Sequence, residues 1–159
     1  MFLEDTWIEA DDLELYTDAS GSKGFGAYFD GEWIRGDWLP SQQPPHRSIQ
    51  WQELFAIVAP TLTWHPRLRG KKICFNCDNE AIVNAWKKKS AKHPHLVALF
   101  RHLFLVAARS NFTIYLHHIP GKKNAVADAL SRNQINRFFS LVPQANINPT
   151  PLPEGLSRL

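Results

Sequence analysis

The segment of residues 13–20 constrains the fold more than any other part of the chain. Apolar Leu13 and Leu15 alternate with their neighbours, which is the two-residue period of a half-buried β-strand, and Asp18 stands at the strand's end. A carboxylate that enters a protein core is costly unless it is paired or bound to a metal ion. The chain must therefore bring a partner to this strand, and three later acids are the candidates: Glu53, Asp78 and Asp128.

Short turns join this first strand to two more. Residues 25–29 and 32–38 have strand character, and Asp30-Gly31 between them is a two-residue hairpin signal. Ser48 is then a candidate N-cap for a helix whose apolar residues recur at three-to-four spacing as far as Leu62. The rest of the pattern predicts a strand, two helices, a strand and a helix, at residues 73–77, 80–87, 96–108, 112–116 and 125–131.

Strands joined by hairpins are antiparallel, whereas strands separated by helices run parallel through right-handed crossovers. We therefore expect an α/β fold: a five-stranded mixed sheet, with three antiparallel strands followed by parallel crossovers, flanked by helices. Pro60 lacks a backbone donor, which predicts that its helix bends or ends there. Residues 1–12 are an acidic lead-in, 13–133 form the domain, and 134–159, with four prolines and little periodicity, are expected to be a tail or linker.

The composition is that of a soluble globular protein, since 44% of the 159 residues are hydrophobic and 21% are charged. No apolar run is long enough to span a bilayer and the N-terminus has no secretory signal pattern, so we expect an intracellular protein without membrane contact. The net charge is only +3, but the positive charge is clustered, as in Lys87-Lys88-Lys89. Such clusters suit a polyanion, above all nucleic acid; a solvated surface is the alternative.

Two cysteines form a CxxC pattern, Cys74 and Cys77, and His93 and His95 follow. The cysteines fall in an expected strand, where a three-residue offset points their side chains to opposite faces. This argues against a zinc site, which needs converging ligands.

The four acids suggest a metal site by their order along the chain. Asp18 ends the first expected strand and Asp78 the fourth; if these strands are neighbours, both acids lie at one edge of the sheet, where open α/β folds place their function. Glu53 lies in the first turns of the intervening helix and Asp128 in the last helix. Clustered carboxylates do not ionise together without cations, and two Mg²⁺ ions, or Mn²⁺ in their place, suit oxygen ligands. Taken singly, each acid has an ordinary alternative as a turn, cap or solvated helix residue.

These acids lie within motifs that resemble the ribonuclease H domain of a reverse-transcribing element, of the gypsy-type or DIRS-like retrotransposon kind. The motifs are Thr17-Asp18-Ala19-Ser20, Gln52-Glu53-Leu54, Cys77-Asp78-Asn79, His118-Ile119-Pro120-Gly121, Asn124 and Ala127-Asp128-Ala129-Leu130-Ser131-Arg132. The resemblance covers residues 13–132, and its closing block is the most specific part.

The resemblance implies a ribonuclease H-like fold and cleavage of the RNA strand in an RNA–DNA hybrid. It implies Asp18, Glu53, Asp78 and Asp128 as the ligands of two metal ions, and an adjoining reverse transcriptase polymerase domain in a parent polyprotein. His118 corresponds to a mobile histidine that shuttles a proton or assists product release; a residue that merely ends a strand is the alternative. A catalytically silent connector or nucleic-acid-binding module of the same fold, and a DNA nuclease or integrase of the same superfamily, remain open.

A hybrid is recognised by its shape and its 2′-hydroxyls. Backbone amides of small residues after Asp18, polar residues at helix starts and the basic cluster are the expected contacts, although capping and solvation are their alternatives. The candidate substrate-binding residues are Ala19, Ser20, Gly21, Ser48, Gln50, Asn79, Trp86, Lys87, Lys88, Lys89 and Asn124.

Overall fold

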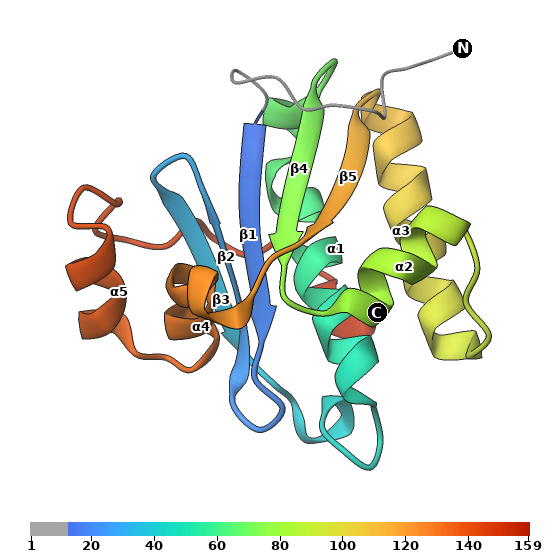
Figure 1. Ribbon diagram of the computed structural model, residues 1–159, viewed down its shortest axis with the longest axis horizontal. Helices are drawn as coiled ribbons and strands as arrows, with labels where there is room; N and C mark the ends of the chain where they lie inside the picture. The colour runs from blue at the N-terminus through green and yellow to red at the C-terminus, as the bar shows by residue number, and fades with distance from the viewer. Residues whose placement is uncertain (1–12) are drawn as a thin grey trace.

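Alternation and tight turns produce the antiparallel half of the sheet, and helical crossovers produce the parallel half (Figure 1). The computed structural model describes residues 13–159, so the expected lead-in of residues 1–12 lies outside the described part. The strands are β1 (Leu13–Ala19), β2 (Gly24–Phe29), β3 (Glu32–Asp37), β4 (Lys72–Cys77) and β5 (Thr113–His118). The helices are α1 (Ile49–Leu68), α2 (Glu80–Lys88), α3 (Pro94–Ser110), α4 (Ala125–Ser131) and α5 (Ile135–Leu141).

The sheet has the expected mixed topology, with strand order β3-β2-β1-β4-β5. The pairs β1–β2 and β2–β3 are antiparallel, and the pairs β1–β4 and β4–β5 are parallel. Asp30 and Gly31 both have positive φ values, of 50° and 84°, as the primed hairpin turn between β2 and β3 requires. None of the described helices is long and apolar enough to cross a membrane.

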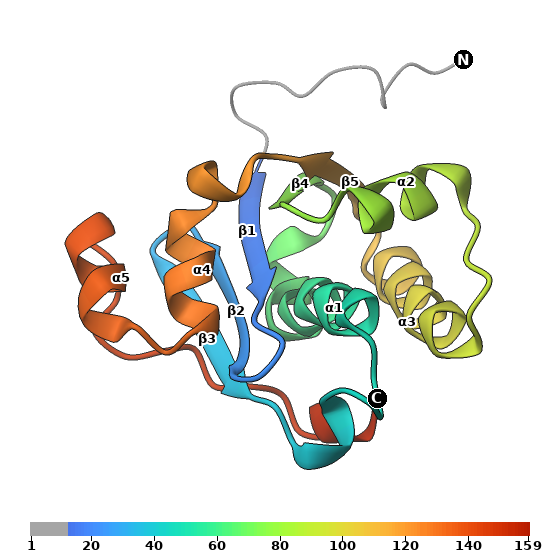
Figure 2. The same cartoon turned by 60° about the horizontal axis from the view of Figure 1, so that its bottom comes forward.

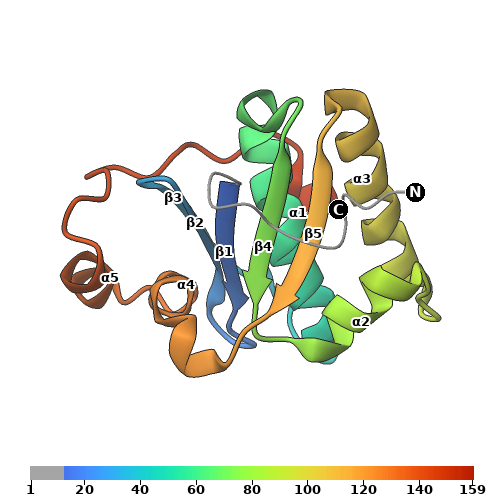
Figure 3. The same ribbon diagram turned by 45° about the horizontal axis from the view of Figure 1, so that its top comes forward.

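Helices cover the sheet on both faces (Figures 2 and 3). On one face α1 packs against β1 and β2, and α3 packs behind α1. On the other face α4 packs against β1 and β2, with α5 beside it. Gly26 on β2 is required for the approach of α4, because a side chain there would collide with Leu130. The two helices α1 and α4 thus hold β1 between them, and β1 carries Asp18.

Of the two outcomes predicted at Pro60, a bend or an end of the helix, the end is wrong, because the first helix continues to Leu68. Its residues from Trp51 to Thr61 are all buried, because α1 packs against both the sheet and α3. An interior proline costs about 3 kcal/mol, and the burial of apolar side chains on every side of this helix outweighs that cost. Thr61 and Thr63 also donate their hydroxyl hydrogens to the carbonyl oxygens of the preceding turn.

The expectation that residues 134–159 form a tail outside the core is wrong. Phe138 on α5 is fully buried in a second apolar cluster, together with Trp33 and Leu130. Beyond α5 the chain runs along the edge strand β3, where the backbone N–H groups of Asn146 and Thr150 donate to carbonyl oxygens of the β2–β3 hairpin. The segment therefore covers a sheet edge and completes the packing around α4.

Candidate active site

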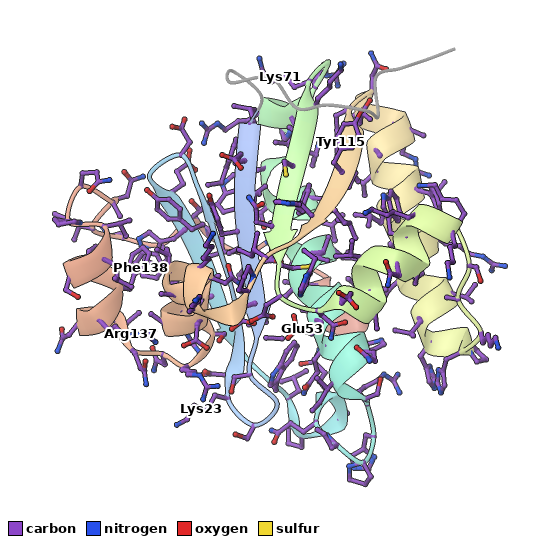
Figure 4. The ribbon with its side chains drawn as sticks, in the orientation of Figure 1. Lys23, Glu53, Lys71, Tyr115, Arg137 and Phe138 are labelled. Atoms are coloured by element: carbon purple, nitrogen blue, oxygen red, sulfur yellow. The ribbon has the colours of Figure 1, made fainter. Side chains whose placement is uncertain are left out.

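Asp18, Glu53 and Asp78 converge from three elements. Because β1 and β4 are parallel neighbours, with Tyr16 opposite Asn76, the acids two residues further on leave the sheet at the same edge. Glu53 reaches the same place from the second turn of α1, and Figure 4 shows it beside the ends of β1 and β4. One oxygen atom from each of the three carboxylates lies within 4.8 Å of the others. The predicted adjacency of Asp18 and Asp78 is confirmed.

Burial makes these carboxylates hard to ionise. Asp18 is 4% exposed and Glu53 is 6% exposed, and Glu53 Oε2 has no hydrogen-bond partner among residues 13–159. Burial, followed by the charges of Asp78 and Asp128, raises the pKa of Asp18 to about 8. Burial, followed by the charges of Asp18 and Asp78, raises the pKa of Glu53 to about 9. Burial also raises the pKa of Asp78.

The donor set fits a hard divalent cation. It offers only oxygen atoms, its buried and crowded carboxyl groups do not all ionise without a cation, and one buried oxygen lacks a partner among the described residues. Asp78 was considered as a helix cap, but α2 is capped by Asn79, whose Oδ1 accepts from the backbone N–H of Ile82 at 3.0 Å. The Asp78 carboxylate is therefore not used by the helix and faces the cluster.

Asp128, the fourth expected ligand, lies outside this group of three. Its Oδ1 accepts from Arg132 Nε at 2.9 Å, and its Oδ2 accepts from Arg137 Nη1 at 2.7 Å. Partial burial alone would raise the pKa of Asp128, but the hydrogen bonds from Arg137 and Arg132 outweigh it and lower that pKa. Asp128 is nevertheless close enough for its charge to raise the pKa of Asp18.

His118 and His117 leave the end of β5 in different directions. His118 is exposed, with Nδ1 3.8 Å from Glu80 Oε2, and its charge offsets part of the effect of burial on the pKa of Asp78. His117 Nδ1 lies 3.0 Å from Oδ1 of Asn76, within the sheet. Of the two histidines, His118 is the one beside the carboxylates, as the sequence predicted.

Three of the predicted substrate contacts form a polar group where α1 and α2 begin. Asn79 Nδ2 donates to Gln50 Oε1 at 2.7 Å, and both side chains are partly exposed. The Ser48 hydroxyl accepts from the backbone N–H of Trp51 at 3.1 Å and so caps α1. The group remains accessible beside Asp78, which is consistent with its predicted role.

The turn after Asp18 is less open than predicted. Ala19 ends β1, and the Ser20 amide donates to the Gly24 carbonyl at 2.8 Å, so this N–H group is already used inside the turn. Gln52, which is fully buried, donates to the Gly21 carbonyl at 3.1 Å and ties α1 to the turn. Sequence reasoning did not single out Gln52, although it adjoins Glu53 in the quoted motif.

Two other predicted contacts are buried, which contradicts their proposed exposure to substrate. Asn124 is 1% exposed and its Nδ2 donates to the Thr17 carbonyl at 2.8 Å, so it fixes the residue before Asp18. Trp86 packs inside the interface of α2 and α3, where it stacks on Phe100 and Phe104 with centroids 5.9 and 4.7 Å away.

The basic residues after Trp86 remain on the surface. Lys87 and Lys88 are exposed, as a contact with phosphate requires. Lys89 is different, because its Nζ lies 3.9 Å from the centroid of the Trp86 ring and burial lowers its pKa. Its side chain therefore serves the packing of α2 as well as the surface charge.

Sequence reasoning missed three residues around the acids. The Ser131 hydroxyl lies 3.2 Å from Asp18 Oδ2 and joins α4 to β1. Ser131 and Arg132 belong to the closing block of the family motif, which was the signal that could have found them. Arg137 lies beyond that block, in the segment expected to be a tail, where the helical spacing of Ile135, Phe138, Phe139 and Val142 was the signal that could have indicated a packed helix.

Comparison with known proteins agrees with this fold. A family model described as reverse transcriptase-like matches residues 35–134, and no curated protein matches the chain. LC11-RNase H1, isolated from compost and solved in complex with an RNA/DNA hybrid, is 19% identical with a TM-score of 0.62, over 79% of this chain and 99% of its own.

Two further structures are similar to the same degree. The N-terminal RNase H domain of a Mycobacterium tuberculosis protein is 14% identical with a TM-score of 0.60, over 82% of this chain and 99% of its own. RNase H1 from the halophilic archaeon Halobacterium salinarum is 14% identical with a TM-score of 0.59, over 79% of this chain and 98% of its own. At identities this low, the structural similarity establishes the fold alone, which is the ribonuclease H fold.

Proposed function

The chain belongs to the reverse transcriptase-like family, and on this premise we propose that it is an endonuclease that hydrolyses the RNA strand of RNA–DNA hybrids. The convergence of Asp18, Glu53 and Asp78, with an unpartnered buried oxygen on Glu53, carries the proposal. Buried acids without counter-charges lower stability, and a bound cation is what makes such an arrangement favourable.

In this proposal Asp18, Glu53 and Asp78 hold divalent metal ions, Mg²⁺ or Mn²⁺, and Asp128 is the fourth ligand. When two such ions are bound, they activate water and stabilise the charge that develops on the phosphodiester. Ser131 and the Ala19 amide orient the Asp18 carboxylate through hydrogen bonds. His118 stands exposed at the rim, where its imidazole can exchange a proton with the reacting strand or help the product to leave.

An RNA–DNA hybrid is the substrate that the surroundings of the site favour. The polar group of Ser48, Gln50 and Asn79 offers donors and acceptors for ribose hydroxyls and phosphates next to Asp78. Lys87 and Lys88 add exposed positive charge for the other strand. LC11-RNase H1, which shares the fold, was solved with such a hybrid. The family's description further supports a reverse transcriptase polyprotein as the parent context, with the polymerase domain adjoining.

The test is cleavage of three labelled duplexes in Mg²⁺: RNA–DNA hybrid, double-stranded RNA and double-stranded DNA. We expect the RNA strand of the hybrid to be cut, with Asp78→Asn reducing the rate at least a hundredfold, because it removes a metal ligand. Asp37→Asn is the matched control, since it makes the same change at an aspartate that is 77% exposed, pairs with Arg35 and does not belong to the carboxylate cluster. Cleavage of DNA alone would favour the DNA nuclease alternative. Binding of hybrid without cleavage, or equal cleavage by Asp78→Asn, would refute the proposal.

A further inference from the structure

The two arginines that hold Asp128 come from different parts of the chain. Arg132 follows α4 directly and lies one helical turn after Asp128. Arg137 belongs to α5 and binds the other carboxylate oxygen. Each oxygen of Asp128 therefore accepts a charge-assisted hydrogen bond from a separate guanidinium group. Neither oxygen of Asp128 belongs to the group of three carboxylates.

Arg137 is held in place by the packing of α5. The next residue, Phe138, is fully buried with its ring centroid 5.2 Å from that of Trp33. Figure 4 labels Arg137 and Phe138 on α5. Arg137 Nη1 also donates to Gln134 Oε1 at 2.9 Å. The guanidinium is thus held by the packing of the neighbouring Phe138 and by a hydrogen bond to an amide, in addition to its bond with Asp128.

We propose that Arg137 is a positioning residue that keeps the Asp128 carboxylate apart from the other three carboxylates, those of Asp18, Glu53 and Asp78. A divalent metal ion that binds Asp128 displaces the Arg137 guanidinium from it. This inference rests on the proposed function, in which Asp128 is the fourth ligand. The guanidinium and the metal ion compete for the same carboxylate oxygen. Arg137 therefore sets the metal concentration at which the four-carboxylate site is completed.

The geometry makes this competition reversible. The side chains of Arg137 and Asp128 are 42% and 27% exposed, so water and salt weaken their attraction. An ion pair of that kind changes a competing equilibrium by about two- to fivefold. A divalent ion near three further carboxylates offers Asp128 a stronger attraction, whereas the arginine prevails when the metal is scarce. If Arg137 instead held Asp128 in the position that metal binding requires, the loss of Arg137 would weaken metal binding.

The test is a titration of the full chain with Mn²⁺, followed by the electron paramagnetic resonance signal of the free ion. We expect Arg137→Gln to bind the weaker of the two ions about two- to fivefold more tightly than the unaltered protein. Arg137→Lys should restore most of the original affinity. Gln134→Ala removes only the side-chain amide that accepts a hydrogen bond from the Arg137 guanidinium, so it should also bind Mn²⁺ more tightly. It provides the test if Arg137→Gln does not fold.

Arg158→Gln is the matched control, because it removes one exposed positive charge from the C-terminal segment without a carboxylate partner among residues 13–159. Its Mn²⁺ affinity should equal that of the unaltered protein. Equal or weaker binding by Arg137→Gln, with the unaltered protein binding normally, overturns this inference and leaves the proposed function standing. An unaltered protein that binds no Mn²⁺ overturns both together.

Discussion

Replacing Asp18 by asparagine should stabilise the metal-free protein and abolish its thermal response to Mg²⁺. The carboxylate is buried, and its neighbours Asp78 and Asp128 add negative charge. Its pKa in the folded protein, about 8, is above its ordinary value of 3.8. The folded state therefore holds a proton that the unfolded chain releases, and stability is lost as the pH rises between these two values. The amide of asparagine does not ionise, so it escapes this loss.

The size of the stabilisation by Asp18→Asn follows from the shift in the pKa of Asp18. One pKa unit corresponds to about 1.36 kcal/mol, which gives an upper limit of about 4 kcal/mol for Asp18 at pH 7. Asp78 carries part of the same negative charge, and asparagine replaces one acceptor oxygen by an amino group near Ser131. We therefore expect a gain of about 1–3 kcal/mol in the free energy of unfolding. For a chain of this length each kcal/mol raises Tm by about 2–4 °C.

The assay is thermal unfolding in EDTA and in excess Mg²⁺, across a series of pH values. In EDTA the advantage of Asp18→Asn should grow from pH 5 to pH 8; in Mg²⁺ the unaltered protein should gain stability and the variant should not. Asp37→Asn is the matched control, because this aspartate is 77% exposed and should change stability by less than about 0.5 kcal/mol. A variant that is less stable than the unaltered protein in EDTA at pH 7, or a gain independent of pH, would refute the reasoning.

Two other substitutions test the stability of the fold and the proposed catalysis separately. Phe138→Ala should lower the free energy of unfolding by about 3–5 kcal/mol in urea denaturation, because the ring is fully buried; a loss below about 1 kcal/mol would mean that α5 does not belong to the core. His118→Ala should reduce kcat on labelled hybrid about tenfold or more while Mn²⁺ binding stays unchanged, since the imidazole is exposed at the rim. Lost metal binding in that variant would contradict a role in proton transfer.

The parts of the fold that were predictable are those fixed by local rules. Asp30-Gly31 specifies its hairpin because both residues must adopt positive φ, and the order of strands and helices then decides which strands are parallel. Pro60 shows where such rules fail. Its cost is local, but the burial that outweighs it depends on α3 and the sheet, which meet α1 from distant parts of the chain.

The site residues show the same difference between features set by local rules and features set by distant parts of the chain. Asp18 and Asp78 were expected at one edge if the first and fourth strands are neighbours, and the pairing of β1 with β4 fulfils that condition. Asn124 and Trp86 were predicted as substrate contacts because Asn124 lies in the family motif at a helix start and Trp86 adjoins the basic cluster, yet both side chains are buried. The residue type alone does not tell whether such a side chain packs inside the protein or contacts the substrate. An amide that holds the Thr17 carbonyl and an amide that holds a ribose are the same residue in the sequence.

The C-terminal segment is the clearest case, and it bears on the chemistry. Its residues Ile135, Phe138, Phe139 and Val142 recur at helical spacing, a signal of α5 that the prediction of a tail did not use. Leu156, which lies in the main core, belongs to no such pattern. The spacing predicts a helix, but it does not tell where on the sheet that helix packs. Yet this packing is what brings Arg137 to Asp128. A substitution that loosens α5 should therefore affect more than stability, since it releases Asp128 from one of its two arginines, and the affinity for metal and the integrity of the core become linked through a helix of seven residues.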